Sequence, residues 1–261
     1  MTRSFWKGAA ALDRTRAVWR YVRHFPMSSE VENPTIVRNP NRSLWEAAVT
    51  GHRAELGQLA ARVWPAVYVW MRASGAEAEE AAQRTEDFFA RMQTVDMPRP
   101  DEEDVAHFQE FLLHRLAAYA EAGYPSADMA AQAAASLVID RAKAEKRFGQ
   151  EPAGRALEEL FARRWALSTL EAVLEALRAE YAAEGKEKLF PFLPPFLSFS
   201  GGEDRYVEIA PEAGLSVSAL HVTVFRFRQR YREVLRRFVG DTVREEADVD
   251  SELTKLLVGA S

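Results

Sequence analysis

Cysteine is absent from the 261 residues of this sequence. Its absence excludes disulfide bonds, thiolate zinc sites and a cysteine nucleophile, and it is compatible with the reducing cytosol. No apolar run approaches the roughly 20 residues that a membrane-spanning helix requires. The N-terminal residues also lack the continuous apolar core of a signal peptide. We therefore expect a cytoplasmic protein without a membrane span.

Strand-like alternation and fixed-period repeats are also missing. The composition, with 48% hydrophobic and 28% charged residues, is that of an ordinary globular protein. Apolar residues recur instead at the spacing of amphipathic helices through most of the chain. The sequence therefore predicts an all-α fold of two helical bundles joined by a short linker.

Motifs of catalysis are lacking as well, because the chain contains no phosphate loop, no nucleophile elbow and no HExxH. Neighbouring acids such as Glu79 and Glu80 diverge around a helix axis, so solvated surfaces explain them. Asp104, His107, Glu110 and His114 share one predicted helical face that could hold a cation. One helix does not complete a coordination shell, so we expect no metal, no cofactor and no enzymatic activity.

Turn-forming and helix-capping residues divide the chain. Two Asn-Pro steps precede residue 43, and the Ser43–Glu46 capping box opens the first helical region. Gly149 to Pro152 is a second break. The predicted parts are a basic helix with a linker (1–42), a first bundle (43–148), a linker with a first helix turn (149–164), a second bundle (165–240) and an acidic tail (241–261). The basic helix is expected to pack on the surface or to touch an anionic partner.

The stretch from Asp204 to Phe238 predicts two helices joined by a tight turn. Asp204 is a candidate N-cap of the first helix, and Gly214 can adopt the positive φ that ends it. Ser216 is a candidate N-cap of the second helix. Pro211 falls inside the first helix and implies that this helix is kinked or ends early.

The second of these helices is strongly basic. An apolar stripe along it consists of Leu220, Val224, Phe227 and Tyr231. Its arginines are Arg226, Arg228, Arg230, Arg232, Arg236 and Arg237. Six positive charges against Glu233 alone give a net +5 in a chain of net charge −5. Such an element suits phosphate binding, and a helix-turn-helix places the first turns of its second helix at base edges. The alternative is an ordinary amphipathic helix with solvated arginines.

Three segments carry a resemblance to a known family: FARRWALSTLEAVLEALRAEY, the GKEKLF that follows, and YVEIA with GLSVSALHVTVFRFRQRYREVL. Over about residues 43 to 257 the chain resembles bacterial sigma factors of the extracytoplasmic-function type, as a divergent member of a subgroup with a longer second domain. The resemblance implies that the second bundle is similar to the fourth sigma domain, whose helix-turn-helix recognises promoter DNA. It implies that the first bundle is similar to the second sigma domain, which binds core RNA polymerase.

The resemblance also implies site residues. The expected DNA-binding residues are Ser218, His221, Val222 and Phe225 in the groove, with Arg226, Arg228 and Arg230 near phosphates. His221 and Phe225 stand where the subgroup has Arg and His, which weakens base readout by cations. The expected polymerase-binding segment is Arg84, Thr85, Glu86, Asp87, Phe88 and Phe89. The alternative for this segment is that both rings are core and the acids are solvated.

One departure from the family lies between Phe108 and Arg147. Opening DNA requires cations and stacking platforms, which are sparse there. Taken as a whole, the resemblance implies a sigma factor-like transcription initiation protein, with core RNA polymerase and promoter double-stranded DNA as partners. The alternative is a sigma-derived DNA- or polymerase-binding regulator that no longer melts promoters. An anti-sigma or other regulatory protein is a further partner that the resemblance allows.

Overall fold

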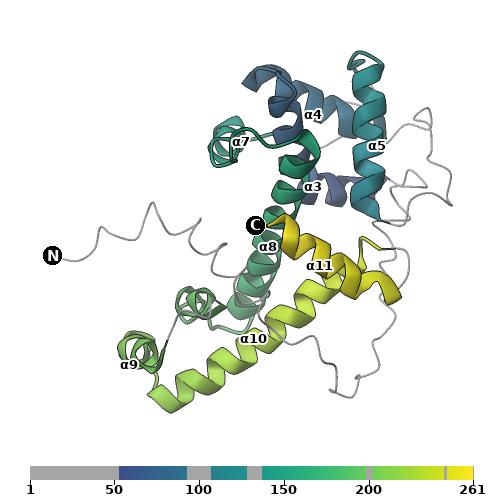
Figure 1. Ribbon diagram of the computed structural model, residues 1–261. Coiled ribbons are helices and arrows are strands. Elements are labelled where there is room, and N and C mark those ends of the chain that lie inside the picture. Colours follow the sequence, from purple (N-terminus) through teal and green to yellow (C-terminus); the bar gives the residue numbers. More distant parts are fainter. Residues whose placement is uncertain (1–52, 93–106, 128–136, 198–201, 244–245, 261) are drawn as a thin grey trace. The chain divides into compact units, whose positions relative to one another are not determined.

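The computed structural model of the chain describes residues 53–92, 107–127, 137–197, 202–243 and 246–260 (Figure 1). These residues form helices and no strand, which confirms the all-α prediction for the described part of the chain. An isolated antiparallel bridge joins His107 and Val243. Among the described helices, none is long and apolar enough to cross a membrane. The predicted basic helix, the linker before residue 43 and the Ser43–Glu46 capping box lie outside the described residues.

The helices have the following bounds. They are α3 (Arg53–Ala73), α4 (Ala78–Met92), α5 (Phe108–Glu121), α7 (Arg141–Phe148), α8 (Leu157–Ala183), α9 (Glu203–Glu212), α10 (Val217–Gly240) and α11 (Val249–Gly259). Short 3-10 helices are η1 (Phe190–Phe192), η2 (Pro194–Leu197) and η3 (Glu246–Asp248).

The described residues fall into two compact units. The small unit contains residues 169–197 and 202–237, and the large unit contains the described residues up to 168 together with 238–243 and 246–260. The sequence placed a linker with a first helix turn at 149–164. Helix α8 begins in this range at Leu157, and its residues up to Ser168 belong to the large unit. The described part of the predicted acidic tail is likewise a helix of the large unit, α11.

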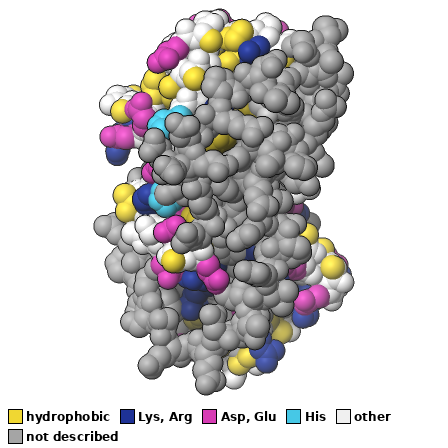
Figure 2. Space-filling model, turned by 90° about the vertical axis from the view of Figure 1, so that its right-hand side faces the viewer, with side chains coloured by type: hydrophobic (Ala, Val, Ile, Leu, Met, Phe, Trp, Pro, Cys, Tyr) yellow, Lys and Arg dark blue, Asp and Glu magenta, His cyan; other side chains and the backbone are white. Residues whose placement is uncertain are grey.

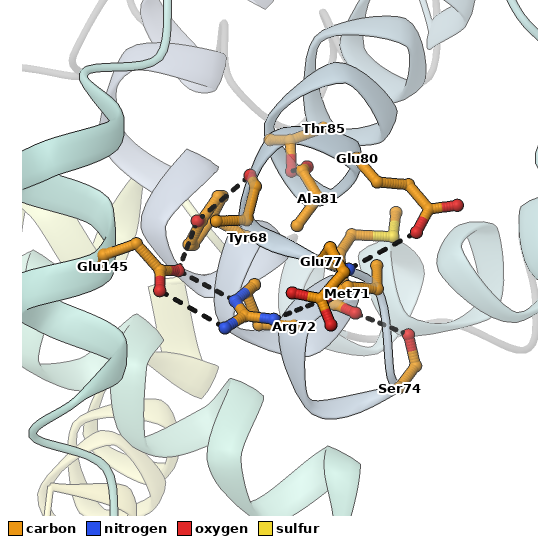
Figure 3. Close-up of polar contacts among 11 residues, drawn as sticks. Tyr68, Met71, Arg72, Ser74, Glu77, Glu80, Ala81, Thr85 and Glu145 are labelled. Atoms are coloured by element: carbon orange, nitrogen blue, oxygen red, sulfur yellow. Dashed lines mark hydrogen bonds and ion pairs between the residues drawn. The ribbon is translucent and has the colours of Figure 1, made fainter.

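In the large unit, α3 packs against α4 and α7. Pro65 does not divide α3, which continues through it as one helix. A polar contact, shown in Figure 3, links α3 to α7. The Glu145 carboxylate of α7 accepts hydrogen bonds from the Tyr68 hydroxyl at 2.6 Å and from Arg72 Nε at 2.8 Å. Burial would raise the pKa of Glu145, but the two hydrogen bonds outweigh burial and lower that pKa.

Helix α11 is held within the large unit by contacts with α5 and α8. The Glu252 carboxylate lies 3.0 Å from Nδ1 of His107, and both side chains are largely buried. Arg163 donates a hydrogen bond to the carbonyl of Ala260 at 3.2 Å. A Cβ added at Gly259 would come within 3.2 Å of the Ala162 carbonyl oxygen, so this glycine permits a close approach of the two helices.

The small unit has an aromatic core. Tyr181 and Phe190 meet Phe227 of α10 edge to face, with ring centroids 6.1 and 6.0 Å from it. Phe190 comes from η1, so the proline-rich stretch after α8 supplies packing groups to α10. Tyr231 lies on the same helix and is fully buried, and burial raises the pKa of its hydroxyl.

Candidate nucleic-acid interface

Helices α9 and α10 are joined by a short turn whose chemistry follows from the sequence. Helix α9 includes Pro211 and ends one residue later at Glu212, with Ala213 as its C-cap directly before Gly214. Gly214 has a φ of +69°, the left-handed conformation that favours glycine. The Ser216 hydroxyl then accepts a hydrogen bond from the N–H of Ala219 at 3.2 Å and caps α10. The predicted cap of α9 is corrected: Gly202 is the N-cap, and Asp204 lies inside the first turn.

One side of α10 is buried in the small unit. Leu220, Val224, Phe227 and Tyr231 are each at most 1% exposed, which confirms the predicted apolar stripe. The stripe fixes the rotation of α10 about its axis, because residues three and four apart share a helical face. The opposite face of the helix must therefore point to solvent.

The four residues expected at the groove lie on or beside this outward face, together with Arg226, which was expected near phosphates. Ser218 and Arg226 are exposed, and Val222 and Phe225 are 49% and 60% exposed. His221 lies at the edge of the face, with its side chain 41% exposed. The structure thus brings Ser218, His221, Val222 and Phe225 together on the first turns of α10.

His221 is held by two residues of α9. Its ring stacks on Tyr206 with centroids 3.7 Å apart and planes at 9°, and its Nε2 lies 3.1 Å from a carboxylate oxygen of Glu203. Tyr206 also packs on Phe196 of η2, with centroids 4.6 Å apart. Sequence reasoning missed Glu203 and Tyr206, because nothing in local spacing shows which residues of α9 face His221.

The three arginines expected near phosphates have different surroundings. Arg228 is half-buried and donates Nε and Nη2 to the carbonyl oxygen of Phe196 at 3.0 and 2.7 Å, so it ties α10 to η2. Arg230 pairs with Glu180 of α8 through two contacts of 2.9 Å and with Glu233 at 2.8 Å. The hydrogen bonds that Arg230 donates to Glu180 raise the pKa of Arg230 further above its usual range.

Arg226 is exposed and, unlike Arg230, forms no ion pair with a described residue. Of the three arginines expected near phosphates, Arg228 and Arg230 are thus held by groups of the small unit, and the Arg230 side chain is still 44% exposed. Where Figure 2 shows described residues on the face in view, acidic and basic side chains are interspersed.

The segment expected to bind polymerase lies on α4 and is mostly interior. Thr85, Asp87, Phe88 and Phe89 are at most 3% exposed. The rings of Phe88 and Phe89 meet edge to face at 5.2 Å, and Phe88 also contacts Tyr119 of α5 at 5.6 Å. Both rings are part of the core, as the alternative for this segment expects, whereas Asp87 is buried and not solvated.

The two remaining residues of the segment reach the surface with partners of their own. Arg84 pairs with Glu80 and lies over the ring of Tyr124, 3.9 Å from its centroid. The Glu86 carboxylate accepts a hydrogen bond from the N–H of Ile139 at 3.0 Å. Only these two side chains of the six are in a position to contact a partner.

A metal site is not formed by the described residues, in which no three His, Asp or Glu side chains are grouped to hold an ion. Of the face considered from the sequence, Asp104 lies outside the described residues. His107 is used differently, because it pairs with Glu252 of α11.

Comparisons with protein-family models, with curated proteins and with solved structures found no match.

Proposed function

We propose that the chain is a sigma factor-like transcription initiation protein that binds core RNA polymerase and promoter double-stranded DNA and performs no chemistry itself. In this proposal, α9 and α10 are a helix-turn-helix, and the large unit carries the polymerase contact. The observation that carries the proposal is the outward face of α10, where Ser218, Val222 and Phe225 are exposed beside Arg226.

The geometry of α10 supports the DNA-binding part of this proposal. A recognition helix enters the major groove with its N-terminal residues, so these must be exposed while the helix is held from behind. Leu220 and Val224 anchor that part of α10, and Arg228 ties its middle to η2. The exposed guanidinium of Arg226 is free to contact a phosphate, which would position the helix without reading sequence.

A binding experiment tests this part. The full chain is titrated against a random duplex pool at 50 and 200 mM salt, with Arg226→Ala as the variant. The proposal expects binding that weakens with salt, and a smaller salt slope for the variant, since one phosphate contact is lost. Arg178→Ala, an exposed cation of α8 in the same unit, is the matched control and should retain the wild-type slope.

The polymerase-binding part needs its own test. Asp87→Lys is unsuitable, because a lysine at a site 3% exposed would disturb folding. Arg84→Glu changes a side chain that reaches solvent, and Glu175→Lys reverses a well-exposed charge elsewhere on the chain. Core polymerase should co-purify with the wild type and the Glu175 variant and less with the Arg84 variant. Run-off transcription with purified core polymerase then tests initiation, and no transcript from any promoter in a genomic pool would contradict it.

The second candidate is a sigma-derived regulator that binds DNA or polymerase but no longer melts promoters. One observation favours it: none of the described Phe, Tyr and Trp side chains of the large unit is exposed. Unpaired bases are captured by stacking on accessible rings, and the rings in the described part of this unit are buried or only partly exposed. Permanganate reactivity of thymines in the presence of polymerase distinguishes the two, because only a melting factor unpairs them.

Either candidate implies a cytoplasmic location, since each binds DNA, polymerase or both. An anti-sigma or other regulatory protein is a further partner in this proposal.

A further inference from the structure

The centre of the outward face of α10 is uncharged over its first turns. Residues Ser218, Val222, Phe225 and Gln229 follow one another at intervals of four, three and four, so they form one line along the helix. All four are exposed. The cation nearest in sequence, Arg226, lies beside this line rather than on it.

Two of these residues are large and apolar. Val222 and Phe225 are 49% and 60% exposed, and only three other large apolar side chains of the described residues are exposed: Val138, Val207 and Val258. An exposed apolar pair on a helix that is otherwise rich in arginine is not explained by folding, because it removes no apolar area from water. A ligand with an apolar group at a polar surface would explain it.

The major groove of DNA offers such a group. Each A·T pair presents the C5-methyl of thymine there, next to the acceptor and donor edge of adenine. Valine and phenylalanine suit the methyl, and the amide of Gln229 can pair with adenine N6 and N7. The residues on the line therefore match A·T pairs better than G·C pairs, which arginine or lysine reads.

We infer, on the basis of the function proposed above, that Val222 and Phe225 select duplex DNA by contacting the C5-methyl groups of thymine in the major groove. Both side chains stand on a helix fixed by Val224 and Phe227 behind it and by Arg228 at its side. Because the helix is already ordered, binding costs little conformational entropy, and the free energy of a methyl contact contributes directly to the affinity. Arg226 supplies the phosphate contact that sets the helix in register.

The test replaces the methyl group alone. Duplexes that bind the full chain are selected from a random pool and resynthesised with deoxyuridine in place of thymidine. The wild type should bind the uracil duplex about fourfold more weakly for each methyl contacted, the factor expected for one buried methyl group. Phe225→Ala and Val222→Ala should bind the thymine duplex more weakly and should lose most of the preference for thymine over uracil. Val258→Ala, an exposed apolar residue of α11, is the control and should retain the wild-type preference.

The outcomes separate this inference from the proposed function. If the wild type binds no duplex at all, the proposed DNA-binding function fails. If it binds thymine and uracil duplexes equally, DNA binding stands and the methyl inference is overturned. If Phe225→Ala leaves duplex affinity unchanged but abolishes co-purification of polymerase, the face is a protein-docking surface and the inference is also overturned. Circular dichroism of each variant confirms that the fold is retained.

Discussion

The ring of His221 on α10 stacks on the ring of Tyr206 on α9, with centroids 3.7 Å apart and planes at 9°. The same tyrosine packs on Phe196 behind it and is 8% exposed. Tyr206 thereby links η2, α9 and the exposed face of α10. The orientation of the candidate interface depends on this aromatic contact as well as on the turn at Gly214.

Replacement of Tyr206 tests that dependence. Tyr206→Ala should lower the free energy of unfolding by about 3 kcal/mol, because it removes a buried ring and leaves a cavity. Tyr206→Phe keeps the ring and should cost less than about 1 kcal/mol. Urea denaturation followed by circular dichroism measures both. Equal losses for the two variants would show that the ring contact is not what matters.

The pair formed by Glu180 and Arg230 should make stability depend on pH. The hydrogen bond from Arg230 lowers the pKa of Glu180 below its ordinary value of 4.5. A carboxyl whose pKa is depressed by folding adds stability above its unfolded pKa and loses it as the pH falls through the folded value. Glu180→Gln should therefore be less stable than the wild type at pH 7 by at most about 1 kcal/mol, since the pair is partly exposed.

That difference should shrink as the pH falls below 4.5, the ordinary pKa of the carboxyl. Thermal unfolding at pH 3, 5 and 7 follows it. Glu175→Gln is a matched control on the same helix, since Glu175 is well exposed and lies 3.8 Å from Arg178. A Glu180→Gln defect of the same size at pH 3 and pH 7 would contradict the assignment.

The stability that Glu252 contributes should depend on pH in the opposite direction to that of Glu180. Burial raises its pKa above 4.5, although His107 and Lys255 act against the rise. A carboxyl with a raised pKa adds stability below its unfolded pKa, and that stability is lost as the pH rises through the folded value. Wild-type α11 should thus open more readily as the pH is raised from 5 to 8, and Glu252→Gln should lack this part of the dependence.

Hydrogen exchange of the α11 amides measures this opening directly. Glu246→Gln alters an exposed acid before the same helix and should behave as the wild type. If the Glu252 variant retains the full wild-type change between pH 5 and 8, ionisation of Glu252 is not its cause.

Phe88 and Phe225 give a comparison of one residue type in two environments. Phe88 is 0% exposed and Phe225 is 60% exposed. Phe88→Ala should lower the free energy of unfolding by about 3 to 5 kcal/mol, whereas Phe225→Ala should change it by less than about 0.5 kcal/mol. Urea denaturation measures both, and a large loss for Phe225→Ala would mean that its role is structural.

Local sequence chemistry predicted the turn between α9 and α10 closely. Gly214 and Ser216 act through their own backbone or that of near neighbours, and the stripe from Leu220 to Tyr231 needs only the helical period. The cap at Asp204 was wrong by two residues, because a capping preference does not say which of several polar or glycine residues starts the helix.

Taken alone, the sequence determined the helical class of the described chain, the turn before α10 and the face of α10 that is buried, since all three follow from periodicity and backbone preference between near neighbours. Tertiary structure decided which charged and aromatic groups remain available. Glu180 lies 50 residues from Arg230 in the chain, and Phe88 is turned inward by the packing of α4 near α5. Pairing and burial over such separations depend on how helices pack, which local spacing does not encode.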